Sequence, residues 1–72
     1  MNNTFTWTDV EDIGLELYEK YPDRNPLEVR FTELRDLVEA LEDFEPAEGQ
    51  SVNEKILEHI QQHWYDEYKD NQ

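Results

Sequence analysis

The chain of 72 residues has no cysteine, two glycines and six basic residues. The absence of cysteine excludes disulfides, thiolate ligation of a metal or cluster, and carriage of sulfur as a persulfide. No apolar run approaches the roughly 18 residues of a membrane-spanning helix. The N-terminal stretch Met1 to Thr4 has neither a basic nor an apolar region of the kind found in targeting signals. We therefore expect a cytoplasmic protein that folds by packing alone.

The length predicts one domain, residues 1–72. A chain of this size buries only about 60% of its unfolded surface, which leaves little room for an enclosed catalytic pocket. No glycine-rich phosphate loop, nucleophile elbow or Ser/His/Asp arrangement can be assembled from the sequence. We expect a protein that is not an enzyme.

Charge is the strongest feature of the composition. Nineteen acidic residues against six basic ones give a formal net charge of −13. Such a field repels nucleic acid and anionic membranes, attracts basic proteins and hard cations, and favours a monomer. Disorder is the competing interpretation of this composition. The periodic spacing of the apolar residues, with nine aromatics among them, argues against disorder for most of the chain.

Apolar residues recur at helical spacing in three segments. The first helix is predicted after Thr8, with a Thr8/Glu11 capping box, and it ends before Pro22. The second is predicted to be capped by Thr32, and the third by a Ser51/Glu54 capping box. The predicted buried stripes are Val10, Ile13, Leu17, Tyr18 and Tyr21, then Leu34, Leu37, Val38 and Leu41 with Phe44 just beyond, then Val52, Ile56, Ile60 and Trp64 with Leu57 and Tyr68 on the flank.

Between the first two helices, Asn25 and Pro26 predict a one-turn helix followed by an extended segment. The fold class is therefore all-α, a small three-helix bundle with a core over about residues 5–68 and a frayed polar tail. The 25–31 segment could bend it towards a winged-helix-like shape. A winged-helix-like shape alone does not imply nucleic-acid binding. The large negative charge argues against a protein that binds nucleic acid.

Carboxylates concentrate in two places in the sequence. One group follows a face of the first helix, and the other surrounds the end of the second helix, where negative charge opposes the helix dipole. Either group can be a solvated face without a function, a docking face for a basic partner, or a loose site for a hard cation. The first group is Asp9, Asp12, Glu16, Glu19 and Asp23; the second is Glu39, Glu42, Asp43 and Glu45.

His59 and His63 lie one helical turn apart, a spacing that suits a surface zinc or nickel site. The metalloprotease motif needs a glutamate directly after the first histidine, but Ile60 occupies that position. We interpret the two histidines as residues at the boundary of the core, and whether they bind metal is left open.

Short motifs along the chain together resemble one family. They are Trp7-Thr8-Asp9, Asp12-Ile13-Gly14, Leu17-Tyr18, Tyr21-Pro22-Asp23, Pro26, Val29-Arg30-Phe31-Thr32, Leu41-Glu42-Asp43-Phe44, Asn53-Glu54-Lys55-Ile56-Leu57-Glu58, Trp64 and Asp66-Glu67. In order and spacing, over roughly residues 5–68, this sequence resembles the IscX family of small acidic proteins of iron–sulfur cluster assembly. The histidine pair is not part of that pattern.

The resemblance implies a modified winged-helix fold and a regulatory role beside the sulfur chemistry. IscX-like proteins bind the cysteine desulfurase IscS at a basic surface that overlaps the frataxin site, and they bind iron weakly through exposed carboxylates. The alternative role is an iron donor to the cluster scaffold. Implied partner contacts are Asp9, Asp12, Glu16, Glu19, Asp23, Glu42 and Asp43; implied iron ligands are Asp12, Glu16, Glu19, Asp23, Glu39 and Asp43; expected apolar anchors are Trp7, Phe31, Phe44 and Trp64.

Overall fold

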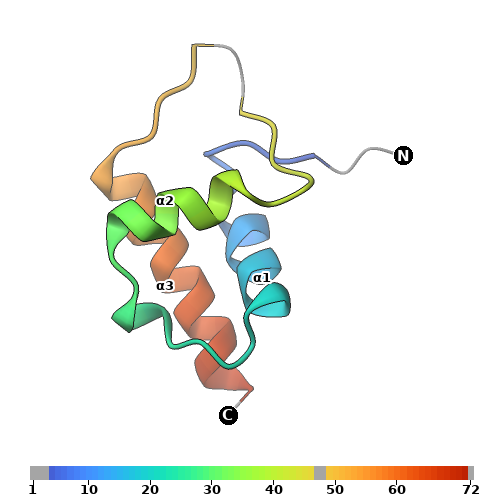
Figure 1. Cartoon of the computed structure of the whole chain (residues 1–72), viewed down its shortest axis with the longest axis vertical. Helices are drawn as coiled ribbons and strands as arrows, with labels where there is room; N and C mark the ends of the chain where they lie inside the picture. The colour runs from blue at the N-terminus through green and yellow to red at the C-terminus, as the bar shows by residue number, and fades with distance from the viewer. Residues whose placement is uncertain (1–3, 47–48, 72) are drawn as a thin grey trace.

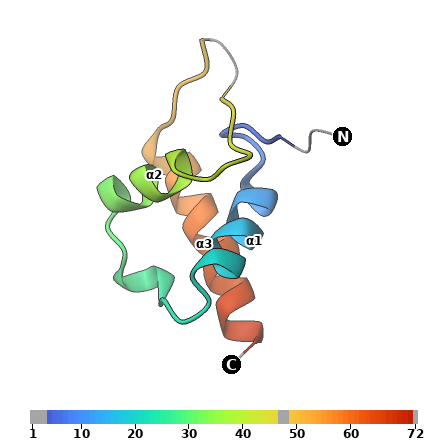
Figure 2. The ribbon, with the colours of Figure 1, turned by 45° about the vertical axis from the view of Figure 1, so that its right-hand side comes forward.

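The computed structural model describes residues 4–46 and 49–71. The chain forms α1 (Val10–Lys20), a one-turn 3-10 helix η1 (Pro26–Glu28), α2 (Phe31–Glu39) and α3 (Glu54–Asp70). Helices α1 and α3 run side by side in the same direction, and α2 crosses them (Figures 1 and 2). The prediction of an all-α, three-helix fold is confirmed. None of the described helices is long and apolar enough to cross a lipid bilayer.

The predicted capping residue of α1 is wrong. Asp9, not Thr8, precedes the first helical residue, and it makes no side-chain cap bond. Its carboxylate instead accepts a hydrogen bond from the backbone N–H of Thr6 at 2.8 Å, while the hydroxyls of Thr6 and Thr8 lie 3.1 Å apart. The local turn formed by residues 6–9 thus occupies the side chains that the capping box would need.

The other two predicted caps are each two residues away from the observed ones. Helix α2 begins at Phe31, with Arg30 as N-cap in place of Thr32. Helix α3 is capped by Asn53 in place of Ser51, because the Asn53 side-chain oxygen accepts from the backbone N–H of Ile56 at 2.9 Å. Asparagine and serine are almost equally good caps, so the register of the apolar stripe decides between them.

The short turn between α1 and α2 agrees with its prediction. The side chain of Asn25 accepts from the backbone N–H of Leu27 at 3.0 Å, and Pro26 takes the first position of η1. The Nε2 of Gln61 on α3 donates to the carbonyl of Pro26 at 3.0 Å, which holds η1 against α3. At the far end, α3 continues to Asp70, two residues beyond the predicted start of the frayed tail.

The core is a single cluster of apolar side chains from the three α-helices and from the segments that precede or join them. Helix α2 buries Leu34 and Val38 of its predicted stripe and partly buries Leu37, whereas Leu41 and Phe44 are buried in the turn that follows the helix. On α3 Leu57 is buried, whereas Ile56, and Val52 ahead of the helix, are only partly buried. Of the expected anchors, Trp7, Phe44 and Trp64 are buried and Phe31 is partly buried. The buried set is Phe5, Trp7, Ile13, Leu17, Val29, Leu34, Val38, Leu41, Phe44, Leu57, Ile60 and Trp64.

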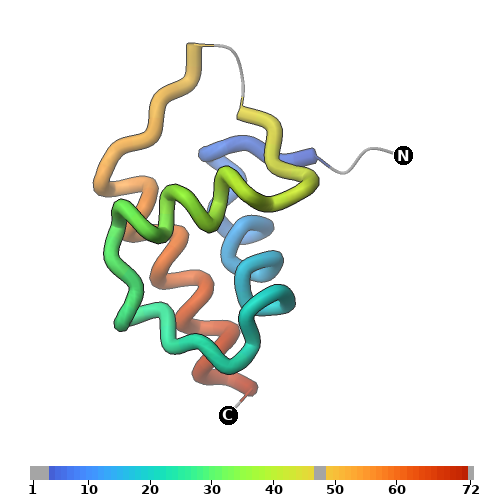
Figure 3. Tube along the Cα trace, viewed as in Figure 1, coloured from blue at the N-terminus to red at the C-terminus, as the bar shows by residue number. Residues whose placement is uncertain are grey.

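The N-terminal segment pairs with the chain that follows α2. Phe5 and Phe44 form an isolated parallel bridge. The backbone N–H of Phe5 donates to Asp43 O at 3.0 Å, and the N–H of Glu45 donates to Phe5 O at 2.8 Å. The ring of Trp7 meets that of Phe44 edge-on, with centroids 4.6 Å apart. Figure 3 shows these two segments lying together above α1.

Gly14 sets the separation between α1 and α3. A Cβ added at this residue would lie 2.7 Å from the Cβ of His63 and 2.9 Å from the backbone nitrogen of Trp64. The first of these atoms belongs to the base of a side chain and the second to a helix backbone, so neither can move without displacing α3. Glycine is therefore required here for the close approach of the two helices.

We predict that Gly14→Ala destabilises the protein. Overpacking costs about 1–3 kcal/mol, and we expect the upper half of that range because the two obstructing atoms belong to a Cβ and to a helix backbone. The better helix propensity of alanine offsets only about 1 kcal/mol of this loss. In a domain of this size, the net loss should lower the Tm by roughly 5–10 °C. Thermal unfolding followed by circular dichroism measures it, with Glu11→Ala on the exposed face of α1 as control. An unchanged or raised Tm would contradict the close packing at Gly14.

Candidate functional site: an acidic surface shared by two segments

The structure brings carboxylates from α1 and from the end of α2 onto one surface. Asp12, Glu16 and Glu19 come from α1, and Glu42 and Asp43 follow α2; we call these five residues the acidic surface. Two open hollows indent it. One, of about 320 Å³, is lined by Glu16, Glu19, Lys20, Leu41, Glu42 and Asp43. The other, of about 440 Å³, is lined by Phe5, Asp12, Leu15, Glu16 and Asp43.

Tertiary packing explains why two groups that lie apart in the sequence meet here. The pairing of Phe5 with Phe44 fixes the backbone on either side of Phe44, and the carbonyl of Asp43 accepts one of its hydrogen bonds. Burial of Leu41 and Phe44 holds the same turn against the core. Glu42 and Asp43, which lie between these two anchors, are exposed. The anchors thus present both carboxylates beside α1.

Glu16 lies at the centre of the acidic surface and borders both hollows. Partial burial raises the pKa of its carboxyl group above the ordinary value, and the charges of Glu19, Asp43 and Asp12 raise that pKa further. The contribution of Asp43 shows that the two segments are electrostatically coupled. Ionisation of Glu16 is therefore less favourable in the folded protein than in water, and a nearby positive charge would make it more favourable.

The remaining carboxylates predicted as site residues lie elsewhere. Asp9 is folded back onto the turn of residues 6–9 by its bond to Thr6. Glu39 lies 3.9 Å from the guanidinium Nε of Arg35, one turn earlier on α2. Asp23 is exposed in the turn after α1 and lines neither hollow. None of these three residues lines either of the two hollows of the acidic surface.

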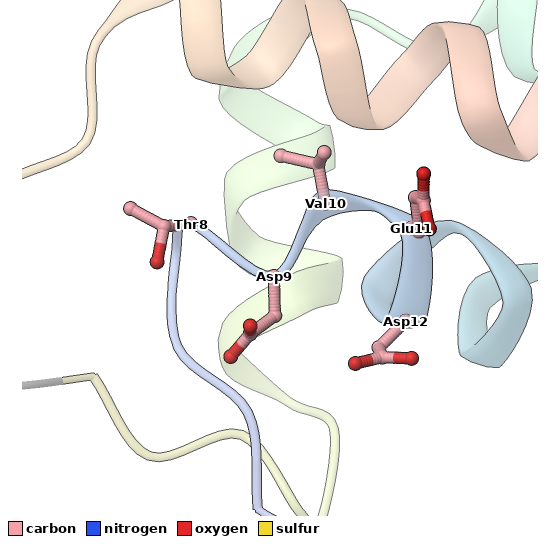
Figure 4. Close-up of a pocket in the computed structure, with 5 residues that line it drawn as sticks. All are labelled: Thr8, Asp9, Val10, Glu11 and Asp12. Atoms are coloured by element: carbon pink, nitrogen blue, oxygen red, sulfur yellow. The ribbon is translucent and has the colours of Figure 1, made fainter.

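A further hollow at the start of α1 is formed by consecutive residues alone. It is lined by Thr8, Asp9, Val10, Glu11 and Asp12. In Figure 4 the carboxylates of Asp9 and Asp12 project on one side of the chain, whereas Val10 and Glu11 point to the other side. Because Glu11 points away from Asp9 and Asp12, only two carboxylates lie on the same side of this hollow, fewer than on the acidic surface.

Metal-binding groups do not converge in the described part of the chain. Among those residues, no three or more His, Cys, Asp or Glu side chains are arranged to hold a metal ion. His59 is exposed, and His63 is partly buried with its Cβ facing Gly14. His63 therefore lies at the edge of the core, as predicted, whereas His59 lies on the surface.

Comparison with known proteins gives the family. Residues 5–69 match the model of the iron-sulphur cluster assembly family. An uncharacterized protein of Pseudomonas aeruginosa is 41% identical over 61 residues, which cover 85% of this chain and 91% of the relative. The chain belongs to the iron-sulphur cluster assembly family, the IscX family suggested by its motifs. This membership supports a role in iron–sulfur cluster assembly.

We predict that Glu16→Gln stabilises the protein at neutral pH. The folded state raises the pKa of Glu16, so it binds more protons than the unfolded state between the unfolded pKa, about 4.3, and the higher folded pKa. Stability from this group falls as pH rises through that window. Removing the charge should gain roughly 0.5 kcal/mol at pH 7, from like-charge pairs on one helix face. The gain should disappear near pH 3.

Urea unfolding of both proteins at pH 3 and pH 7 measures this difference. Glu28→Gln, on the exposed surface of η1, is the control for loss of one negative charge. A Glu16→Gln variant that is less stable than the parent at pH 7 would contradict the proposed electrostatic cost.

Proposed function

We propose that this protein docks on the cysteine desulfurase of iron–sulfur cluster assembly through the acidic surface and modulates that enzyme without catalysing a reaction. The observation that carries the proposal is the convergence of Asp12, Glu16 and Glu19 with Glu42 and Asp43. Family membership identifies the assembly machinery as the setting. The desulfurase is the partner that the IscX resemblance implies, at a site that overlaps the one for frataxin.

The chemistry of the acidic surface favours a basic protein partner. Exposed carboxylates steer a positively charged surface into contact, and their attraction weakens as salt increases. Ionised Glu16 is destabilised by burial and by its neighbours. Arginine or lysine from a partner would relieve that cost and add charge-assisted hydrogen bonds. The absence of cysteine is consistent with a regulator that takes no part in sulfur transfer.

We predict that the double variant Asp12→Lys, Glu16→Lys binds the desulfurase roughly ten-fold or more weakly at low salt, a loss of at least about 1.4 kcal/mol. Both side chains border the same hollow, so the change replaces attraction with repulsion at the centre of the acidic surface. Calorimetry or biolayer interferometry at two salt concentrations measures the change, and the variant should also show a weaker salt dependence.

A matched control is Glu28→Lys with Glu58→Lys. These exposed residues lie on η1 and α3, away from both hollows, and the control carries the same change in net charge. Figure 2 shows η1 on the opposite side of α3 from α1. We expect the control to bind almost as tightly as the parent. If both double variants bound equally weakly, binding would depend on the net charge of the protein and not on the acidic surface.

We further propose that the acidic surface binds iron weakly and exchangeably. Exposed carboxylates are suitable oxygen ligands for hard cations, and Glu16 and Asp43 border the same two hollows. Because the described side chains do not form a converging ligand set, binding requires rotamer changes and retained water. Such a site has little selectivity among divalent metals.

We predict that anaerobic addition of iron(II) broadens the amide NMR signals of residues 12–19 and 42–43. A moderate excess of citrate should restore the signals, because the site has no enclosed geometry. The Asp12→Lys, Glu16→Lys variant should lose the broadening. Iron that stays bound in excess citrate would contradict weak binding, and would favour the alternative role of an iron donor to the cluster scaffold.

A further inference from the structure

Leu15 is an exposed apolar residue inside the acidic surface. It is 42% exposed, and within the described residues only Leu27, at 57%, is another large hydrophobic side chain of the exposed class. Leu15 lines the same hollow as Asp12, Glu16 and Asp43, with buried Phe5 at its edge. An apolar side chain in that position keeps water contact in the free protein and is surrounded by charge.

The position of Leu15 matters because charge alone makes a poor interface core. Exposed charges raise the association rate and set the salt dependence of a complex, but contribute little to its lifetime. Lifetime comes mainly from a few apolar or aromatic groups that become fully desolvated, with polar groups around them that exclude water. Leu15, flanked along α1 by Asp12 and Glu16, has the arrangement of such a central group.

We propose that Leu15 is the apolar anchor of the docking face, an inference that rests on the proposed function. The matching region of the desulfurase would present an apolar side chain or shallow recess surrounded by arginine or lysine. The arginine or lysine side chains of the desulfurase would pair with Asp12, Glu16 and Asp43, and its apolar recess would receive Leu15. In this proposal the carboxylates set the association rate of the complex, and Leu15 sets its dissociation rate.

Leu27 provides a matched control. It belongs to η1, which packs on α3 away from α1, and it lines none of the described hollows. It is at least as exposed as Leu15. Replacing either leucine by alanine therefore removes a similar amount of exposed apolar surface without altering charge, but only Leu15 borders the acidic surface.

Kinetic binding measurements on the full chain and the purified desulfurase test the proposal. Leu15→Ala should bind roughly ten-fold more weakly, through faster dissociation, with the salt dependence of association unchanged. Leu27→Ala should bind like the parent. Circular dichroism should show both variants folded, since neither side chain belongs to the core. Equal binding by Leu15→Ala and Leu27→Ala would overturn the anchor.

Leu15→Glu gives a test of opposite sign. If the docking face acted by charge alone, an added carboxylate beside Asp12 and Glu16 would tighten binding and steepen its salt dependence. With Leu15 as anchor, the variant should bind more weakly than Leu15→Ala, because a charge is then desolvated at an apolar contact. Tighter binding by Leu15→Glu would overturn the proposal.

These results are separate from a failure of the proposed function. Weak binding by Asp12→Lys, Glu16→Lys together with normal binding by Leu15→Ala would leave the docking face standing without its anchor. Normal binding by both variants would remove the acidic surface itself as the docking face.

Discussion

The pairing of Phe5 with Phe44 is the interaction on which the acidic surface depends. It joins the N-terminal segment to the turn after α2 through a parallel bridge and two backbone hydrogen bonds. The edge-on contact of Trp7 with Phe44 adds apolar burial to the same junction. Without that junction, Glu42 and Asp43 would lie on a polar connection between two helices. With it, both residues line a hollow together with Glu16, and the charge of Asp43 contributes to raising the pKa of the Glu16 carboxyl group.

The close approach of α1 and α3 supplies the base for this arrangement. Gly14 lets the two helices pack with a Cβ and a backbone nitrogen of α3 against α1. The molecule measures 36 × 29 × 16 Å, so it is only about two layers of helices thick. A domain this thin has little room for an enclosed cavity, so its polar side chains lie on open surfaces. The two hollows of the acidic surface are accordingly open to solvent.

Much of the fold could be predicted from the sequence, because apolar periodicity reports local structure directly. The stripe ending in Leu41 and Phe44, the turn at Asn25 and the helix stop before Pro22 all agree with the structure. The predicted capping residues were wrong because tertiary packing, and not the nearest polar side chain, decides where each helix begins. Helices α1 and α2 begin after Asp9 and Arg30 without a side-chain cap bond, and only α3 is capped by a side chain, that of Asn53.

The candidate site could be predicted only in parts. Its carboxylates stood out in the sequence as two groups, but Asp9 and Glu39 take local partners instead of joining the acidic surface. Nothing in the helical spacing shows that Asp43 meets Glu16, because a bridge across nearly forty residues brings them together. Leu15 also escaped the pattern analysis. The sequence shows only that Leu15 is an apolar residue outside the buried stripe of the first helix. Its position beside Asp12, Glu16 and Asp43 is visible only in the folded structure.

Docking through the acidic surface can be tested by an NMR titration of the ¹⁵N-labelled protein with the cysteine desulfurase of the same organism. At low salt we expect broadening or shifts concentrated on residues 12–19 and 42–43, weakened at moderate salt, with residues 26–28 of η1 little affected. An unchanged spectrum at low salt would contradict docking on this enzyme. Changes confined to η1 would contradict the acidic surface as the contact.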